Sequence, residues 1–133
     1  RYSNTSAYLF VRFGKSNGKT HYMPICYTIY AVHGAGGGRM EGGKVNRLMQ
    51  LASICDADIY IHSHTHLPAI VKNSYYRMCL TNDSVAKVDR LFVNTSSTLN
   101  YGGYGEIQTY KPNSIETPVI ILDGTKHLAR AIL

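Results

Sequence analysis

The sequence predicts one α/β (α+β) domain over residues 1–133, with more strand than helix. Short apolar runs rich in β-branched and aromatic residues recur along the chain, which is typical of strands. One longer segment has the apolar spacing of a helix, and glycine-containing turns separate the elements. Apolar residues form 44% of the chain and charged residues 17%, which is typical of a globular protein rather than a disordered one. No apolar run reaches the roughly 20 residues that cross a bilayer, so we expect no membrane partner.

The first two strands are expected to form a hairpin. Residues 7–13 read AYLFVRF, and residues 20–32 read THYMPICYTIYAV. The turn signal Asn17-Gly18 lies between them, as in an antiparallel pair.

A helix is expected next, over residues 44–55 (KVNRLMQLASIC), after the glycine-rich segment 34–43. Its apolar residues are spaced by three, four and seven, which places them on one helical face: Val45, Leu48, Met49 and Ala52. A further strand follows at Ile59–Ile61. Residues 27–61 therefore have the order and length of a βαβ unit, whose two strands are parallel.

Histidines follow both strands of this unit. His33 comes directly after the first, and the segment ADIYIHSHTHLP (residues 57–68) places His62, His64 and His66 after the second. The carboxyl ends of parallel strands lie at one edge of a sheet, so we expect the two groups to meet there. Neutral imidazole is a common ligand of transition metals, and three in five residues favour a metal site over isolated structural histidines.

The rest of the chain is expected to be mostly strand. Strands are predicted at residues 75–80, 86–89 and 91–96, followed by a connection rich in tyrosine and glycine at residues 100–113. A closing hairpin is predicted in residues 118–133 across Asp123-Gly124. His21 and His127 are interpreted as ordinary hydrogen-bonded residues.

The segment GRMEGGKV (residues 38–45) nearly matches a phosphate-binding loop and lies between a strand and a helix. Val45 occupies the position where that motif needs a hydroxyl for magnesium. A nucleotide-binding loop is therefore the weaker interpretation. Glycines after His33 also allow the backbone to come close to a bound substrate.

Four segments in order, VHGAGGGR, GGKVNRL, ADIYIHSHTHLP and FVNTSS, resemble the calcineurin-like metallophosphoesterases, and most of all the small phage and prophage-type members. The resemblance covers residues from about His33 to Asp123. It implies a four-layer αββα sandwich with a two-metal site at the strand ends, of which this chain is the β-rich half.

The resemblance also implies roles for single residues. His33, His64 and His66 are the metal ligands, with one of the last two for each ion. His62 has no ligand counterpart and is expected to support the site, to face substrate or to act in catalysis. Residues expected beside the substrate or behind the ligands are Gly34, Arg39 and Asn94.

Several features depart from the family pattern. Ser63 replaces a glycine, and Thr95-Ser96 replaces Pro-Gly. The Asp-x-His, Gly-Asp and Gly-Asn-His motifs, which supply further ligands and the catalytic histidine, do not occur in these residues. The chain therefore resembles the C-terminal portion of such an enzyme.

We expect a metal-dependent phosphoesterase that uses two divalent ions (Mn, Fe, Zn or Ni) and is completed by an N-terminal segment or by another copy of the chain. The substrate is a phosphate ester, and the net charge of +6 is compatible with nucleic acid. The alternatives are a remnant that binds one metal or none, and a nucleotide- or nucleic-acid-binding module. Three cysteines without C-x-x-C spacing favour reduced, buried thiols and a cytoplasmic location.

Overall fold

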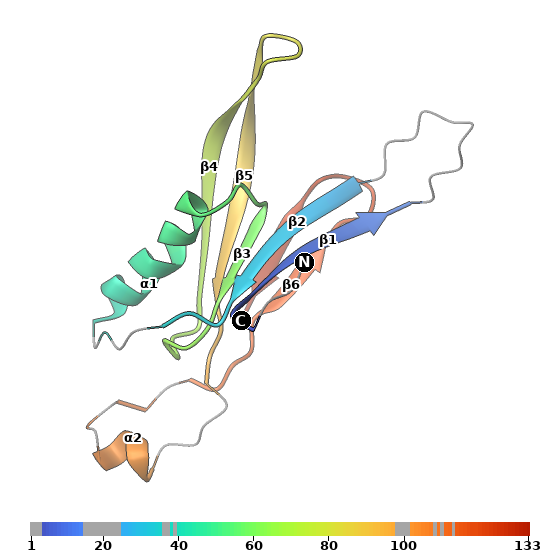
Figure 1. Cartoon of the computed structure of the whole chain (residues 1–133). Coiled ribbons are helices and arrows are strands. Elements are labelled where there is room, and N and C mark those ends of the chain that lie inside the picture. The colour runs from blue at the N-terminus through green and yellow to red at the C-terminus, as the bar shows by residue number, and fades with distance from the viewer. Residues whose placement is uncertain are drawn as a thin grey trace.

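The computed structural model describes residues 4–14, 25–35, 38, 40–97, 102–107, 109, 111–112 and 114–133. Its elements, in chain order, are β1 (Ser6–Phe13), β2 (Ile25–Val32), α1 (Glu41–Gln50), a 3-10 turn (Leu51–Ser53), β3 (Ile59–His62), β4 (Ala69–Cys79), β5 (Ser84–Asn94), α2 (Tyr104–Ile107), β6 (Val119–Leu122) and β7 (Ala129–Ile132). Figure 1 shows their arrangement.

Five strands form one mixed sheet in the order β1-β2-β3-β5-β4. β1 is antiparallel to β2, and β4 is antiparallel to β5. β3 lies between β2 and β5 and is parallel to both. The predicted first hairpin and βαβ unit are thus confirmed, and the carboxyl ends of three adjacent strands lie at one edge. The turn signal Asn17-Gly18 and His21 fall outside the described residues.

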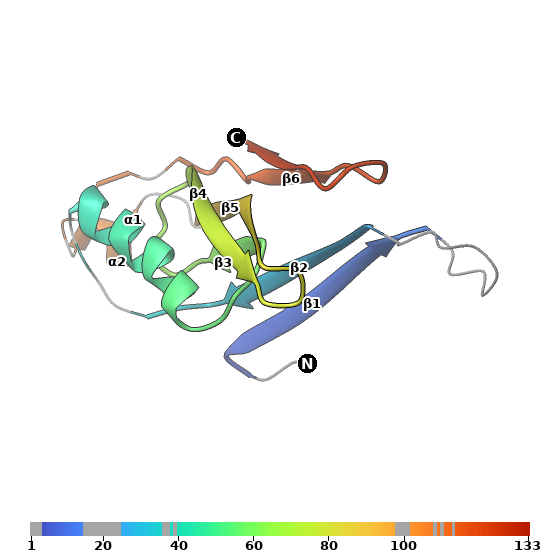
Figure 2. The ribbon, with the colours of Figure 1, turned by 90° about the horizontal axis from the view of Figure 1, so that it is seen from above.

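Two apolar clusters cover the two faces of this sheet, because successive strand residues point to opposite sides. On one face α1 contributes Leu48 to a cluster with Tyr30, Tyr60 and Phe92. On the other face the hairpin of β6 and β7 covers a second cluster, built on Ile29, Ile59, Leu91 and Val93. Figure 2 shows α1 and β6 on opposite sides of the sheet. The described residues therefore form three layers, and the fourth layer of the expected sandwich is not among them.

The helix differs from its prediction at both ends. It begins at Glu41 and its α-helical part ends at Gln50, so Gly42 and Gly43 belong to its first turn and not to the preceding loop. Leu48 is completely buried on the predicted apolar face. Within the described part of the chain, no helix is long and apolar enough to cross a bilayer.

β4 and β5 form a long two-stranded ribbon, paired from Ala69 with Asn94 to Cys79 with Ser84. The first strand predicted in this region, at residues 75–80, falls on the second half of β4, which begins six residues earlier. The two strands predicted at residues 86–89 and 91–96 were wrong, because one continuous strand, β5, replaces them. The apolar pattern fails there because residues 74–89, named the arm below, extend away from the body (Figure 1) and expose most side chains on both faces. Cys79 is exposed at the end of β4, contrary to the expected buried thiol.

The base of the arm is attached to the body by two arginines. Arg77 and Arg90 each donate a hydrogen bond to the same carboxylate oxygen of Asp56, over 2.9 and 2.7 Å. The Arg90 guanidinium also lies over the Tyr75 ring, 4.3 Å from its centroid. Asp56 precedes β3, so the arm is tied to the strand that leads into the histidines.

The closing hairpin is confirmed. β6 and β7 are antiparallel, and the predicted Asp123-Gly124 lies in the turn between them. The Asp123 carboxylate accepts hydrogen bonds from the backbone N–H and hydroxyl of Thr125 and from the N–H of Lys126, and these bonds, chiefly those from Thr125, lower the pKa of Asp123.

Candidate metal centre

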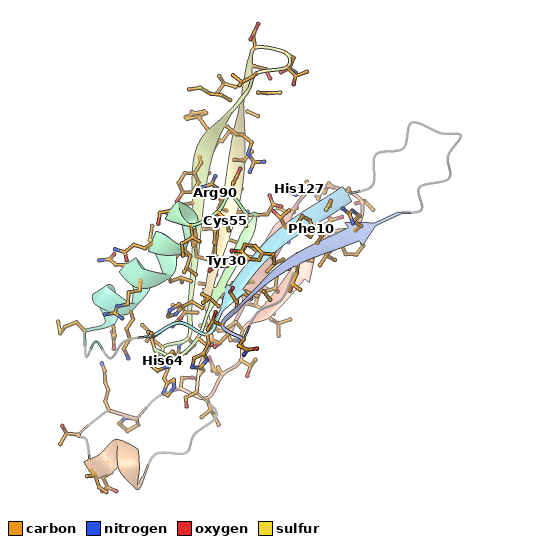
Figure 3. The ribbon with its side chains drawn as sticks, viewed as in Figure 1. Phe10, Tyr30, Cys55, His64, Arg90 and His127 are labelled. Carbon is orange, nitrogen blue, oxygen red and sulfur yellow. The ribbon has the colours of Figure 1, made fainter. Side chains whose placement is uncertain are left out.

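The candidate site is built on three residues that lie side by side at the carboxyl ends of β2, β3 and β5: Val32, His62 and Asn94. Val32 pairs with His62, and His62 pairs with Asn94. His33 follows Val32, and the loop with His64 and His66 follows His62. The predicted convergence of the two histidine groups at one sheet edge is therefore confirmed. Figure 3 shows His64 at this edge, away from Arg90 and His127.

His33 and His64 are in direct contact. Nε2 of His33 is 3.3 Å from Nδ1 of His64, and the ring centroids are 5.2 Å apart. The Ser63 hydroxyl donates to the His33 carbonyl over 3.4 Å and lies 3.5 Å from Nδ1 of His33. Since its own proton is used on the carbonyl, the Ser63 oxygen is free to accept the Nδ1 proton of His33. That tautomer directs the lone pair of Nε2 at His64.

His66 lies beside the same pair but is less exposed. Its ring centroid is 6.3 Å from that of His64. Partial burial, followed by the nearby His64, Lys44 and His33, lowers the pKa of His66. The neutral form, which alone can bind a metal, is therefore favoured at His66.

The loop after β3 has an unusual backbone. His64 and His66 have φ values of 62° and 55°, in the left-handed region that few residues other than glycine adopt. The N–H of Thr65 between them donates to the Ser63 carbonyl over 2.6 Å. In an extended chain His62, His64 and His66 would all point to one side. The tight turn instead directs His64 toward His33, while the His62 side chain stays buried.

Asn94 holds this turn in place from β5. It is 1% exposed, and its amide nitrogen donates to the Thr65 hydroxyl and to the Leu67 carbonyl. Because a carbonyl can only accept, these bonds fix the orientation of the amide, and Oδ1 of Asn94 faces Nδ1 of His62 at 2.8 Å. His62 must then carry its proton on Nδ1. The sequence did not predict the structural role of the buried Thr65 hydroxyl, because a single threonine between histidines carries no pattern of its own.

His62 itself is 3% exposed. That burial favours a supporting position over contact with a substrate, so the catalytic role suggested for His62 stays an untested prediction. Gly34, at φ +82°, lies against the His62 ring. Arg39 falls outside the described residues, so its expected role stays a prediction as well.

Helix α1 flanks the site, with Glu41 in its first turn and Arg47 in its last. Arg47 donates a hydrogen bond to the Ala35 carbonyl over 2.7 Å and so fixes the segment after His33. Lys44 is close enough to His66 to affect its pKa. Glu41 is paired with Lys111, and this contact, above all its hydrogen bond, lowers the pKa of Glu41. The sequence pattern identified the helix but gave no sign of the Arg47 contact.

The two loops thus bring His33, His64 and His66 together at one edge of the sheet. In the described ranges, no three His, Cys, Asp or Glu side chains are already grouped closely enough to hold a metal ion. His127 lies elsewhere, stacked on Tyr27 and hydrogen-bonded to the Cys26 carbonyl over 3.1 Å, in the ordinary role that was predicted. No protein-family model, curated protein or solved structure matches this chain.

Proposed function

We propose that this chain is the histidine-bearing C-terminal portion of a metal-dependent phosphoesterase, in which His33, His64 and His66 bind divalent transition-metal ions. The main support is the distance of 3.3 Å between Nε2 of His33 and Nδ1 of His64. Two nitrogens bound to one tetrahedral ion at ordinary bond lengths are about 3.4 Å apart. The two rings therefore already have the separation that a shared ion requires.

The donor set fits such an ion in other ways. Imidazole nitrogens suit zinc, iron, nickel and manganese at a hydrolytic site. Ser63 provides His33 with a partner for its second nitrogen, as metal-bound histidines generally need. In the metal-free chain the Nδ1–H group of His64 donates a hydrogen bond to Nε2 of His33. A change of tautomer at His64 removes this proton from the contact without any change in charge.

Bound divalent ions supply a hydroxide from water at neutral pH and offset the negative charge of a phosphate. The residues of this chain would hold the ions at the sheet edge, and Lys44 adds a positive charge beside His66. Both features suit the hydrolysis of a phosphodiester or a phosphomonoester.

A two-ion hydrolytic site also needs carboxylate ligands, and among the described residues no Asp or Glu belongs to a group of three or more side chains that could hold a metal ion. We therefore propose that another polypeptide segment supplies them, either an N-terminal segment or a second copy. The outer face of the β6–β7 hairpin is compatible with such a neighbour, because three aliphatic side chains there are about half exposed: Val119, Ile121 and Ile132. The phosphate-loop alternative gains no support, since residues 41–43 are helical and Val45 has no hydroxyl.

Metal analysis of the purified chain tests the ligand assignment. We expect wild type, after dialysis against metal-free buffer and loading with Zn²⁺ or Mn²⁺, to retain at least one ion per chain. The double variant His64→Ala, His66→Ala should retain none, because two of the three imidazoles are lost. His127→Ala is the matched control and should bind as wild type does. Equal metal content in wild type and the double variant would refute the assignment.

A further inference from the structure

We propose that His62 is a positioning residue whose buried ring sets the spacing between the two histidine-bearing loops, and that Gly34 is required because only glycine leaves room for that ring. This inference rests on the proposed metal site for its functional meaning. The contacts that carry it belong to the fold itself and can be tested without metal.

The contact between Gly34 and His62 leaves no space for a side chain. A Cβ atom added to Gly34 would lie 2.1 Å from Nε2 of His62, and 2.7 and 2.8 Å from the two adjoining ring carbons. Real Cβ contacts essentially never fall below 3.0 Å, so either the ring or the loop would have to move. Gly34 directly follows His33, and a shift of its backbone would displace that histidine.

The His62 ring cannot easily move away. On its other side Nδ1 donates to Oδ1 of Asn94 over 2.8 Å, and Asn94 is itself held by Thr65 and Leu67. The backbone of His62 is also fixed, because its carbonyl accepts a hydrogen bond of 2.9 Å from the Thr95 N–H. The ring is therefore a rigid spacer between β5 and the loop after β2.

The same network links the spacer to the second histidine loop. Asn94 binds His62 with its oxygen and the loop after β3 with its nitrogen, at Thr65 between His64 and His66. One buried pair thus determines where His33 and His64 stand relative to each other. An aliphatic residue at position 62 would leave the buried Asn94 oxygen without a donor, and such a loss is costly.

A double-mutant cycle between Gly34 and His62 tests the proposal. Gly34→Ala should weaken binding of Zn²⁺ by at least tenfold in the wild-type background, measured by titration calorimetry. In the His62→Ala background, Gly34→Ala should weaken Zn²⁺ binding less than threefold, because no ring remains for the added Cβ to collide with. The remaining loss reflects the positive φ of Gly34, which disfavours alanine. Gly38→Ala, where an added Cβ meets nothing within 4 Å, is the control and should bind as wild type does. An equal factor in both backgrounds would overturn the proposal.

A second readout does not depend on metal. In the metal-free chain, the nuclear Overhauser contact between the His33 and His64 rings should weaken in His62→Ala, which lacks the spacer, and disappear in Gly34→Ala. In the double variant the contact should be as strong as in His62→Ala, because no ring remains to collide with the added Cβ, and circular dichroism should be unchanged throughout. If wild type binds no ion, the proposed function is refuted. The nuclear Overhauser contact between the His33 and His64 rings then still tests whether His62 positions the two loops. If Gly34→Ala does not fold, the double variant must fold; failure of both to fold contradicts the proposal.

Discussion

At His64 and His66 the backbone adopts a conformation that costs about 1–2 kcal/mol per residue for an L-amino acid. The buried Asn94 amide, bonded to Thr65 and Leu67, offsets part of this cost. The sequence predicted where these histidines gather, because the βαβ pattern fixes which strand ends are neighbours. It could not predict the turn itself, since the residues in the left-handed region are not glycines and the anchoring Asn94 comes from a strand 30 residues later.

The lowered pKa of His66 predicts a pH dependence of folding. Burial is the main cause, and His64, Lys44 and His33 add to it. A histidine whose pKa is lower in the folded state takes up its proton more readily when unfolded. Its contribution to stability is therefore present above the unfolded pKa, about 6.5, and is lost as the pH falls through the lower folded pKa. We expect the metal-free His66→Asn variant to lose less stability than wild type between pH 7 and pH 5 in urea denaturation.

Asn46→Gln, on the exposed side of α1, serves as the control for this pH series and should follow wild type. Parallel losses of stability in wild type and in His66→Asn would contradict the prediction.

Among the elements, the β6–β7 hairpin shows how one side chain attaches a second sheet to the first. Tyr27 of β2 is completely buried, and its hydroxyl accepts the N–H of Leu128 over 2.9 Å. The hydroxyl oxygen also lies 2.7–3.0 Å from three carbonyls of the hairpin, of Asp123, Lys126 and Leu128. One proton can serve only one carbonyl at a time. The hairpin was predictable from Asp-Gly, but its attachment to a tyrosine about 100 residues earlier was not.

Tyr27→Phe should therefore destabilise the chain by about 1–3 kcal/mol, because the partly buried N–H of Leu128 and one carbonyl lose their partner. Thermal unfolding followed by circular dichroism would show this as a drop of several degrees in Tm. Tyr76→Phe, at an exposed tyrosine on the arm, is the matched control and should leave Tm unchanged. A Tm for Tyr27→Phe equal to that of wild type would show that the hydroxyl contributes nothing.

For the molecule as a whole, the described architecture is a mixed α/β fold of three layers with the histidines at one sheet edge. Sequence patterns were sufficient for the part of the chain with regular burial, from β1 to β3 and again at β6 and β7. Over β4 and β5 they missed the first half of β4 and divided β5 in two, because the ribbon leaves the body there and burial no longer imposes an alternating pattern.

The isolated chain is expected to hydrolyse a generic phosphodiester, such as bis(p-nitrophenyl) phosphate, poorly or not at all, even when loaded with metal. The reason is that, in the part of the chain that the structure describes, no Asp or Glu joins the histidines in a group that could hold a metal ion. Steady-state rates with Mn²⁺, Zn²⁺ or Ni²⁺ provide the measurement, with the His64→Ala, His66→Ala variant as background. Strong turnover by the wild-type chain alone would mean that no further segment is needed.

The arm gives the molecule a built-in attachment point for a spectroscopic label. Cys79 is an exposed free thiol at the end of β4, whereas Cys26 and Cys55 are partly covered and burial raises the pKa of Cys55, which lowers its reactivity toward maleimides. β5 runs unbroken for 11 residues, so about 33 Å of ribbon separates the tip from Asn94. A fluorophore on Cys79 would thus stand within energy-transfer range of a second dye near the histidines, and the transfer efficiency would report any change in that distance when a partner binds at the sheet edge.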